Sequence, residues 1–181
     1  FSKKNDNVKR NQIIKEIKKN KTLNDVLKSV KISKDEFEEL YIVSREINDE
    51  FYQNFKKEYT KKRQKALIRN LRNNNLNRAI KLSKITKKQF LKWYFSGEES
   101  FSDFYIKTTE ILMEKYIDYR KNDWSHKEIL KEINVTQLMF NSWDKHDEFV
   151  MFNEFERENQ KIDSDLEKRG LILKGIKGGK G

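Results

Sequence analysis

The chain has 181 residues, of which 35% are apolar and 38% are charged, and its net charge is +11 with a sequence pI near 9.6. This low apolar fraction argues against one large core and for small helical units, while the basic charge indicates a polyanionic partner, nucleic acid before an anionic membrane surface. The absence of cysteine excludes disulfides and thiolate metal sites, and no apolar run approaches the ~18 residues of a membrane span, so we expect a cytoplasmic protein, nucleoid-associated if the host is prokaryotic.

Three segments carry one repeated pattern. In chain order they are ISKDEFEEL from Ile32, ITKKQFLKW from Ile85 and VTQLMFNSW from Val135, spaced by 53 and then 50 residues. Each has a β-branched residue, then Ser or Thr, three variable positions, Phe, two variable positions, and Leu or Trp. The chain contains no proline, so only short polar clusters interrupt helices. Each copy is therefore predicted to form a helix, a short helix, a tight turn, a second short helix, a loop and a further helix.

Helix boundaries and core positions follow from residue types within each copy. The residues predicted to cap the first short helix are Thr22, Asn75 and Ser125, and those predicted to cap the second are Ser33, Thr86 and Thr136. Capping boxes are predicted for Ser33 with Glu36 and for Thr86 with Gln89. Core pairs three residues apart share one face of the second short helix: Phe37 and Leu40, Phe90 and Trp93, Phe140 and Trp143.

Apolar spacing near 3.6 continues between the copies, which predicts long helices that join them. The last of these, near residues 148–168, is expected to end at Gly170. We therefore predict an all-α chain of three tandem units: a first unit at 1–59, a strongly basic second unit at 60–109, an acidic third unit with a C-terminal helix at 110–169, and a flexible tail at 170–181.

The strings KISKDEFEEL, KITKKQFLKW and NVTQLMFNSW resemble the homeodomain-like helix-turn-helix. The third copy, with the stretch from Trp143 to Phe149 that follows its motif, also resembles small subunits of phage terminases, and the DNA-binding regions of transposases and recombinases are similar. The resemblance implies a phage or mobile-element protein in which the second short helix enters the major groove of double-stranded DNA. The turn position that favours glycine holds Lys31, Lys84 and Asn134, and because lysine adopts a left-handed backbone at a cost, we expect looser turns in the first two copies.

Charge differs sharply among the copies. Residues 60–97 contain twelve lysines and arginines and no acid, whereas residues 9–59 contain twelve bases and ten acids, and residues 110–160 contain seven bases and twelve acids. The middle unit is therefore expected to bind DNA, with Lys87, Lys88 and Lys92 as its reading face. A phosphate is expected at the helix N-terminus that follows Asn75. The candidate DNA-binding residues are Arg69, Arg72, Arg78, Lys84, Lys87, Lys88, Gln89, Lys92, Gln137 and Asn141.

Two other classes of function stay open. One is a helical-repeat interaction scaffold whose basic segment binds an acidic protein, and the first or third unit is also a candidate for contact with a protein partner or a second copy. The other is an RNA binder, which ranks lower because most aromatic residues align as core rather than as exposed stacking surfaces. The polar stretch from Asp144 to Glu148 lacks the spacing of a metal site, and no nucleophile or phosphate-loop signature is present, so we expect a non-catalytic protein with no cofactor and no metal.

Overall fold

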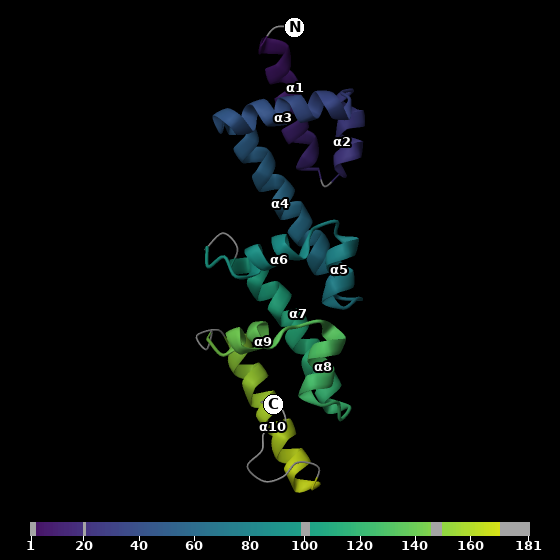
Figure 1. Cartoon of the computed structure of the whole chain (residues 1–181), viewed down its shortest axis with the longest axis vertical. Coiled ribbons are helices and arrows are strands. Elements are labelled where there is room, and N and C mark those ends of the chain that lie inside the picture. The colour runs from purple at the N-terminus through teal and green to yellow at the C-terminus, as the bar shows by residue number, and fades with distance from the viewer. Residues whose placement is uncertain (1–2, 20, 99–101, 146–149, 171–181) are drawn as a thin grey trace. The chain divides into compact units, whose positions relative to one another are not determined.

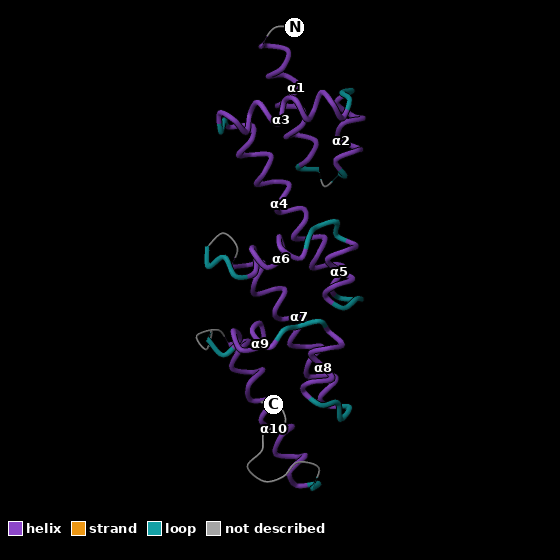
Figure 2. The backbone as a smooth tube through the Cα atoms, viewed as in Figure 1, coloured by secondary structure: helices purple, strands orange, loops and turns teal. Residues whose placement is uncertain are grey.

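The computed structural model describes residues 3–19, 21–98, 102–145 and 150–170, and within these ranges the protein is all-α. Ten helices and no strand occur among the described residues, and loops connect the helices (Figure 2). None of these helices is both long enough and apolar enough to cross a membrane. The prediction of an all-α chain is therefore confirmed, and the expected tail at 171–181 lies outside the described residues.

The backbone groups into two compact units, residues 1–66 and residues 67–181 (Figure 1). Unit 1 contains α1 (Lys3–Ile17), α2 (Leu23–Val30), α3 (Lys34–Ile47) and the first part of α4 (Glu50–Leu71). Its core is built from apolar residues of all four helices and of the turn between α2 and α3: Ile13, Ile17, Val26, Leu27, Ile32, Phe37, Phe51 and Phe55. The buried residues of this cluster all come from unit 1, and the last of them in the sequence is Phe55.

Unit 2 begins with the end of α4 and continues through α5 (Leu76–Leu82), α6 (Lys87–Tyr94), α7 (Ser102–Lys121), α8 (His126–Ile133), α9 (Gln137–Trp143) and α10 (Val150–Lys168). One buried cluster runs from Leu67 to Phe155 and includes residues of every one of these helices. The arrangement of α8 and α9 repeats that of α5 and α6 along the unit (Figure 1). The second and third predicted segments, which we divided at 109–110, therefore share one core, because α7 packs against both helix pairs.

The predicted caps are found at the starts of the short helices. Thr22, Asn75, Ser125, Ser33, Thr86 and Thr136 each accept the backbone N–H three residues on. At Ser125 the bond is reciprocated, since Glu128 accepts the Ser125 backbone N–H and completes a capping box. These bonds satisfy N–H groups that a helix leaves without an internal partner, so local sequence fixes where each short helix begins.

The turn between the short helices has the same backbone conformation in all three copies. Lys31, Lys84 and Asn134 have φ of 61°, 57° and 61°, which is the left-handed region. In each case the next residue donates its N–H to the carbonyl five residues back, over 3.1 Å at Ile32, 3.4 Å at Ile85 and 3.0 Å at Val135. This 6→1 bond and an apolar residue after the turn define a Schellman motif. The expectation that the lysine turns adopt a looser conformation is therefore wrong.

The pairs predicted as core are buried with one exception. Phe37, Phe90, Phe140, Trp93 and Trp143 are buried, whereas Leu40 is only partly buried against the unit 1 cluster.

The predicted short helix of the first copy is longer than expected, because nothing interrupts it before Asn48, which ends α3 with φ of 50°. In the second copy the helix stops at Tyr94, and Gly97 follows with φ of 68°. The predicted end of α10 is confirmed by Lys168 and by the left-handed Gly170.

Candidate nucleic-acid interface

Helix α6 is amphipathic because its aromatic residues anchor one side in the core. Phe90 and Trp93 are buried and pack against the ring of Phe104 in α7, with centroid separations of 6.0 and 5.7 Å and near-perpendicular planes. Such edge-to-face pairs stabilise beyond their buried area. Tyr94 is buried as well, whereas Lys87, Lys88 and Lys92 are exposed.

Four further predicted basic residues lie in unit 2 outside α6. Arg69 and Arg72 lie at the C-terminal end of α4 and just beyond it, Arg78 lies in α5, and Lys84 occupies the turn before α6. All four side chains are exposed. Gln89 differs, since its side chain is half-buried and its backbone N–H is bound to the Thr86 hydroxyl.

These cations have no carboxylate partner among the described residues. No ion pair with a described residue involves any of the following side chains: Arg69, Arg72, Arg78, Lys84, Lys87, Lys88 and Lys92. The uncompensated positive charge produces a field that attracts polyanions and is weakened by salt.

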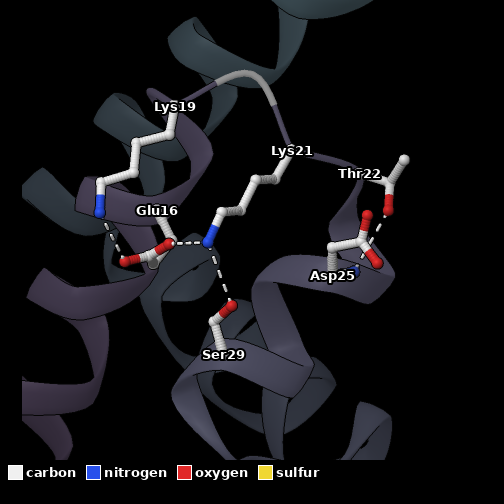
Figure 3. Close-up of polar contacts among 6 residues, drawn as sticks. All are labelled: Glu16, Lys19, Lys21, Thr22, Asp25 and Ser29. Atoms are coloured by element: carbon white, nitrogen blue, oxygen red, sulfur yellow. Dashed lines mark hydrogen bonds and ion pairs between the residues drawn. The ribbon is translucent and has the colours of Figure 1, made fainter.

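In the first copy, by contrast, several lysines form ion pairs with glutamates. Lys19 and Lys21 both bind the carboxylate of Glu16, over 3.1 and 2.5 Å, and Lys21 also donates to Ser29 (Figure 3). A further ion pair joins Lys9 to Glu36 over 3.3 Å. Cations neutralised in this way contribute less to attraction of a polyanion, which separates the first copy from the second by geometry as well as by sequence.

The expected phosphate site at the start of α5 is not available in this geometry. The backbone N–H of Asn77 donates to the side-chain oxygen of Asn134 over 3.2 Å, and that of Arg78 donates to Asn75 over 2.9 Å. Two of the donors that a phosphate requires at a helix N-terminus are therefore already bound within the protein. That expectation is wrong, and the bond from Asn134 instead ties the turn of the third copy to α5.

The structure places Gln137 and Asn141 together on the exposed side of α9. The Gln137 side-chain Nε2 donates to Asn141 Oδ1 over 2.8 Å, while its Oε1 accepts from His126 Nε2 over 2.7 Å. His126 was not among the residues predicted to bind DNA. Its sequence signal was available, since alignment of the copies places His126 where the other two have Leu23 and Leu76.

Burial shifts the pKa values of Tyr116 and Lys115 in α7. Burial raises the pKa of the Tyr116 hydroxyl, which lies behind His126, to about 12. Burial lowers the pKa of Lys115, whose ammonium donates to the Asn74 carbonyl over 2.6 Å. Within the described ranges no three His, Cys, Asp or Glu side chains gather as a metal-ligand group, and residues 146–148 of the polar stretch weighed as a metal site lie outside those ranges.

No protein-family model matches the chain, and neither the curated proteins nor the solved structures gave a match. In helix α6, aromatic packing fixes one side, and the exposed side carries three lysines without an ion-pair partner among the described residues.

Proposed function

We propose that this chain binds double-stranded DNA through a helix-turn-helix unit formed by α5 and α6, with α6 lying in the major groove. The observation that supports this most directly is the set of exposed lysines on α6 without an ion-pair partner among the described residues. The capped start of α6, its buried aromatic side and the left-handed turn before it give these lysines a rigid support.

Within this proposal the cations divide into two roles. Lys87 and Lys88 lie in the first turn of α6, the end that approaches base edges in helix-turn-helix proteins. A lysine there favours guanine, whose O6 and N7 are acceptors in the major groove. Arg69, Arg72 and Lys84 lie outside α6 and are assigned to phosphate oxygens, which position a protein without reading sequence.

The first and third copies have the same local geometry with different surfaces. We infer that all three helix pairs are helix-turn-helix units, because each has a capped second helix after a Schellman turn. The unit formed by α5 and α6 supplies most of the affinity. The resemblance of the repeated strings to phage terminase small subunits and to transposase DNA-binding regions leads us to propose a role in a phage or mobile element.

A charge-reversal experiment tests the proposal. In the double variant Lys88→Glu/Lys92→Glu, binding to a random duplex measured by fluorescence anisotropy should be lost, because repulsion replaces attraction on the helix that enters the groove. The matched control is Lys28→Glu/Lys57→Glu, which changes the net charge equally at two exposed positions of unit 1. The control should retain most of the affinity.

The outcomes separate DNA binding from the other classes. Equal loss in both double variants would mean that net charge alone governs binding, and would overturn the assignment to α6. Retained binding in the α6 variant would remove α6 from the interface. Tighter binding to single-stranded RNA than to any duplex would favour the RNA class instead.

A protein-interaction scaffold is the second candidate, and one observation favours it. Helix α3 exposes Ile42, Val43 and Ile47, with 46%, 54% and 69% of each residue accessible. Val43 and Ile47 are four residues apart and so share one face of the helix. If this face pairs two copies of the chain, Ile47→Lys should lower the mass measured by sedimentation equilibrium, while Asn24→Lys, the same charge change at an exposed position of α2, should not. A wild-type protein that stays monomeric at every concentration would contradict this candidate.

A further inference from the structure

Four side chains form a continuous hydrogen-bonded series from the core of unit 2 to the exposed side of α9. The Tyr116 hydroxyl lies 2.7 Å from His126 Nδ1, His126 Nε2 lies 2.7 Å from Gln137 Oε1, and Gln137 Nε2 lies 2.8 Å from Asn141 Oδ1. The four residues come from α7, α8 and α9. Tyr116 and His126 are buried, at 0% and 4% exposure, whereas Gln137 and Asn141 are exposed.

The direction of each bond follows from the chemistry of the groups. Gln137 Oε1 carries no hydrogen, so His126 Nε2 must donate to it. In the neutral ring the other nitrogen, Nδ1, then accepts, and the Tyr116 hydroxyl donates to it. The imidazole is further held by edge-on packing against Phe140, with centroids 4.6 Å apart. A buried ring with both nitrogens bound has one orientation, and it imposes one orientation on the Gln137 amide.

This orientation determines what α9 presents to a ligand. The Gln137 oxygen points to His126, so its amide nitrogen points outward and donates to Asn141 Oδ1. No described residue accepts from the Asn141 amide nitrogen, which keeps both of its hydrogens, and its oxygen keeps a second lone pair. Leu138, three residues before Asn141, is 71% exposed and lies on the same side of the helix.

Such a surface matches one base pair better than the others. Asn pairs with the N6 donor and N7 acceptor of adenine through its oxygen and nitrogen together, and an apolar side chain contacts the methyl group of thymine. The residues at the same helix positions of the second copy, Lys87 and Leu91, offer no amide. A neutral amide pair also adds little phosphate attraction, so its value lies in discrimination.

We propose that Asn141 and Leu138 read an A·T base pair in the major groove and that His126 is the positioning residue that fixes the amide pair for this contact. The inference rests on the proposed function, because it assumes that the chain binds duplex DNA. It adds a chemical preference to the third copy, which is otherwise acidic and contributes little to affinity.

The repeat itself supplies the variant that tests His126. Leu76 occupies the aligned position in the second copy and is buried at 1% exposure, so leucine is compatible with this local fold. His126→Leu removes the donor to Gln137 without adding a buried polar group. His126→Gln retains an amide nitrogen near the position of Nε2 and is the conservative variant expected to restore the bond.

The experiment starts from duplexes selected by the wild-type chain from a random pool. Each A·T pair of the selected site is replaced by G·C, and the pair whose replacement matters in the wild type but not in Asn141→Ala is identified. At that pair the wild type should discriminate by ~10-fold, within the range expected for one good amide contact. His126→Leu should lose most of this discrimination, His126→Gln should recover part of it, and the dependence of affinity on salt should be the same in all three.

Other outcomes overturn the inference in distinguishable ways. Discrimination that is lost in Asn141→Ala but intact in His126→Leu would remove the positioning role. Duplex binding with no A·T preference would overturn the reading by α9 and leave the proposed function standing. Absence of duplex binding in every variant would overturn both.

A second measurement does not depend on DNA or on the stability of His126→Leu. In the wild-type chain, ¹⁵N chemical shifts of the His126 ring should show the tautomer protonated at Nε2. Tyr116→Phe removes the donor to Nδ1 and should weaken both this tautomer preference and the A·T discrimination. A ring protonated at Nδ1 in the wild type would overturn the bond directions on which the inference depends.

Discussion

Trp143 donates its indole N–H to the hydroxyl of Tyr94 over 3.0 Å, and this bond joins α9 to α6 inside the core of unit 2. The same hydroxyl lies 2.5 Å from Thr109 Oγ1 on α7. Burial raises the pKa of Tyr94 well above its ordinary value, so the hydroxyl remains protonated and can donate to Thr109 while it accepts from Trp143. Three helices from two copies of the repeat therefore meet at one buried polar group.

Removal of this hydroxyl should destabilise unit 2 as a whole. In Tyr94→Phe the buried indole N–H of Trp143 loses its acceptor, which costs ~1–3 kcal/mol of the free energy of unfolding. Urea denaturation followed by circular dichroism measures the change. Tyr119→Phe, which removes a hydroxyl without a hydrogen-bond partner among the described residues, is the control and should have little effect. Unchanged stability in Tyr94→Phe would show that the bond contributes nothing to the coupling of the two copies.

Affinity for duplex DNA should fall steeply with salt. If about half of the twelve cations in residues 60–97 face one duplex, ~6 phosphate contacts and a log–log slope near −5 are expected. Binding to a random duplex between about 50 and about 200 mM salt measures the slope. A shallow slope would contradict the phosphate surface.

The variant Lys87→Ala should distinguish base recognition by α6 from electrostatic attraction to the phosphates. Loss of one cation should change the salt slope by only about one unit, while preference for a selected duplex should relax by ~1–3 kcal/mol if Lys87 contacts a base. Comparison of selected and random duplexes in the variant and the wild type decides between these effects. A steep slope with no preference for any duplex, even in the wild type, would reduce the chain to a non-specific electrostatic binder.

The buried ion pair between Arg120 and Asp163 should dominate the polar contribution of α10 to stability. Arg120 is 1% exposed and Asp163 7% exposed, so Asp163→Ala would leave a guanidinium buried without its counter-charge. Loss of one partner of such a pair costs ~3–5 kcal/mol. The control is Arg169→Ala, which breaks an ion pair to Asp123 that is over half exposed on both sides and should cost less than ~1 kcal/mol. Similar effects of the two variants on chemical denaturation would contradict the importance of burial.

The pKa of the Glu16 carboxyl group should lie below its ordinary value. Hydrogen bonds from Lys21 and then Lys19 lower the pKa of its carboxyl group from the ordinary 4.5 (Figure 3). Because the folded-state pKa is lowered, the stabilisation is present above the ordinary value and is lost as the pH falls through the lowered pKa. Carboxyl ¹³C shifts measured against pH give the value directly. Lys21→Ala should raise it toward 4.5, whereas Lys28→Ala should leave it unchanged.

Local features of the fold were readable from the sequence because they depend on neighbouring residues. The cap at Thr86 needs only a hydroxyl before a helix, and the burial of Phe90 and Trp93 follows from their spacing of three. The length of α3 was missed because the pattern of the other copies was imposed on a segment with no breaker before Asn48. Leu40 is only partly buried, so its alignment with the tryptophans of the other copies predicted a deeper burial than the structure has.

Features that join distant segments were not readable. Arg120 and Asp163 are 43 residues apart, and no local pattern pairs them. The bonds of His126 to Tyr116 and Gln137 depend on how three helices pack, although the replacement of an aligned leucine by histidine marked the position as unusual. The candidate interface was predictable only as a set of exposed cations, and their lack of acidic partners required three-dimensional coordinates.

The sharing of α7 between two copies has a mechanical consequence. Phe104 near its start packs on α6, and Tyr116 near its end packs on Phe140 of α9. A straight helix rotates by about 100° and advances by about 1.5 Å with each residue. One alanine inserted between Phe104 and Tyr116 would therefore turn the α8–α9 pair by roughly a quarter of a revolution against α5–α6. The number of residues in α7 therefore sets the rotation of the α8–α9 pair relative to the α5–α6 pair about the axis of α7.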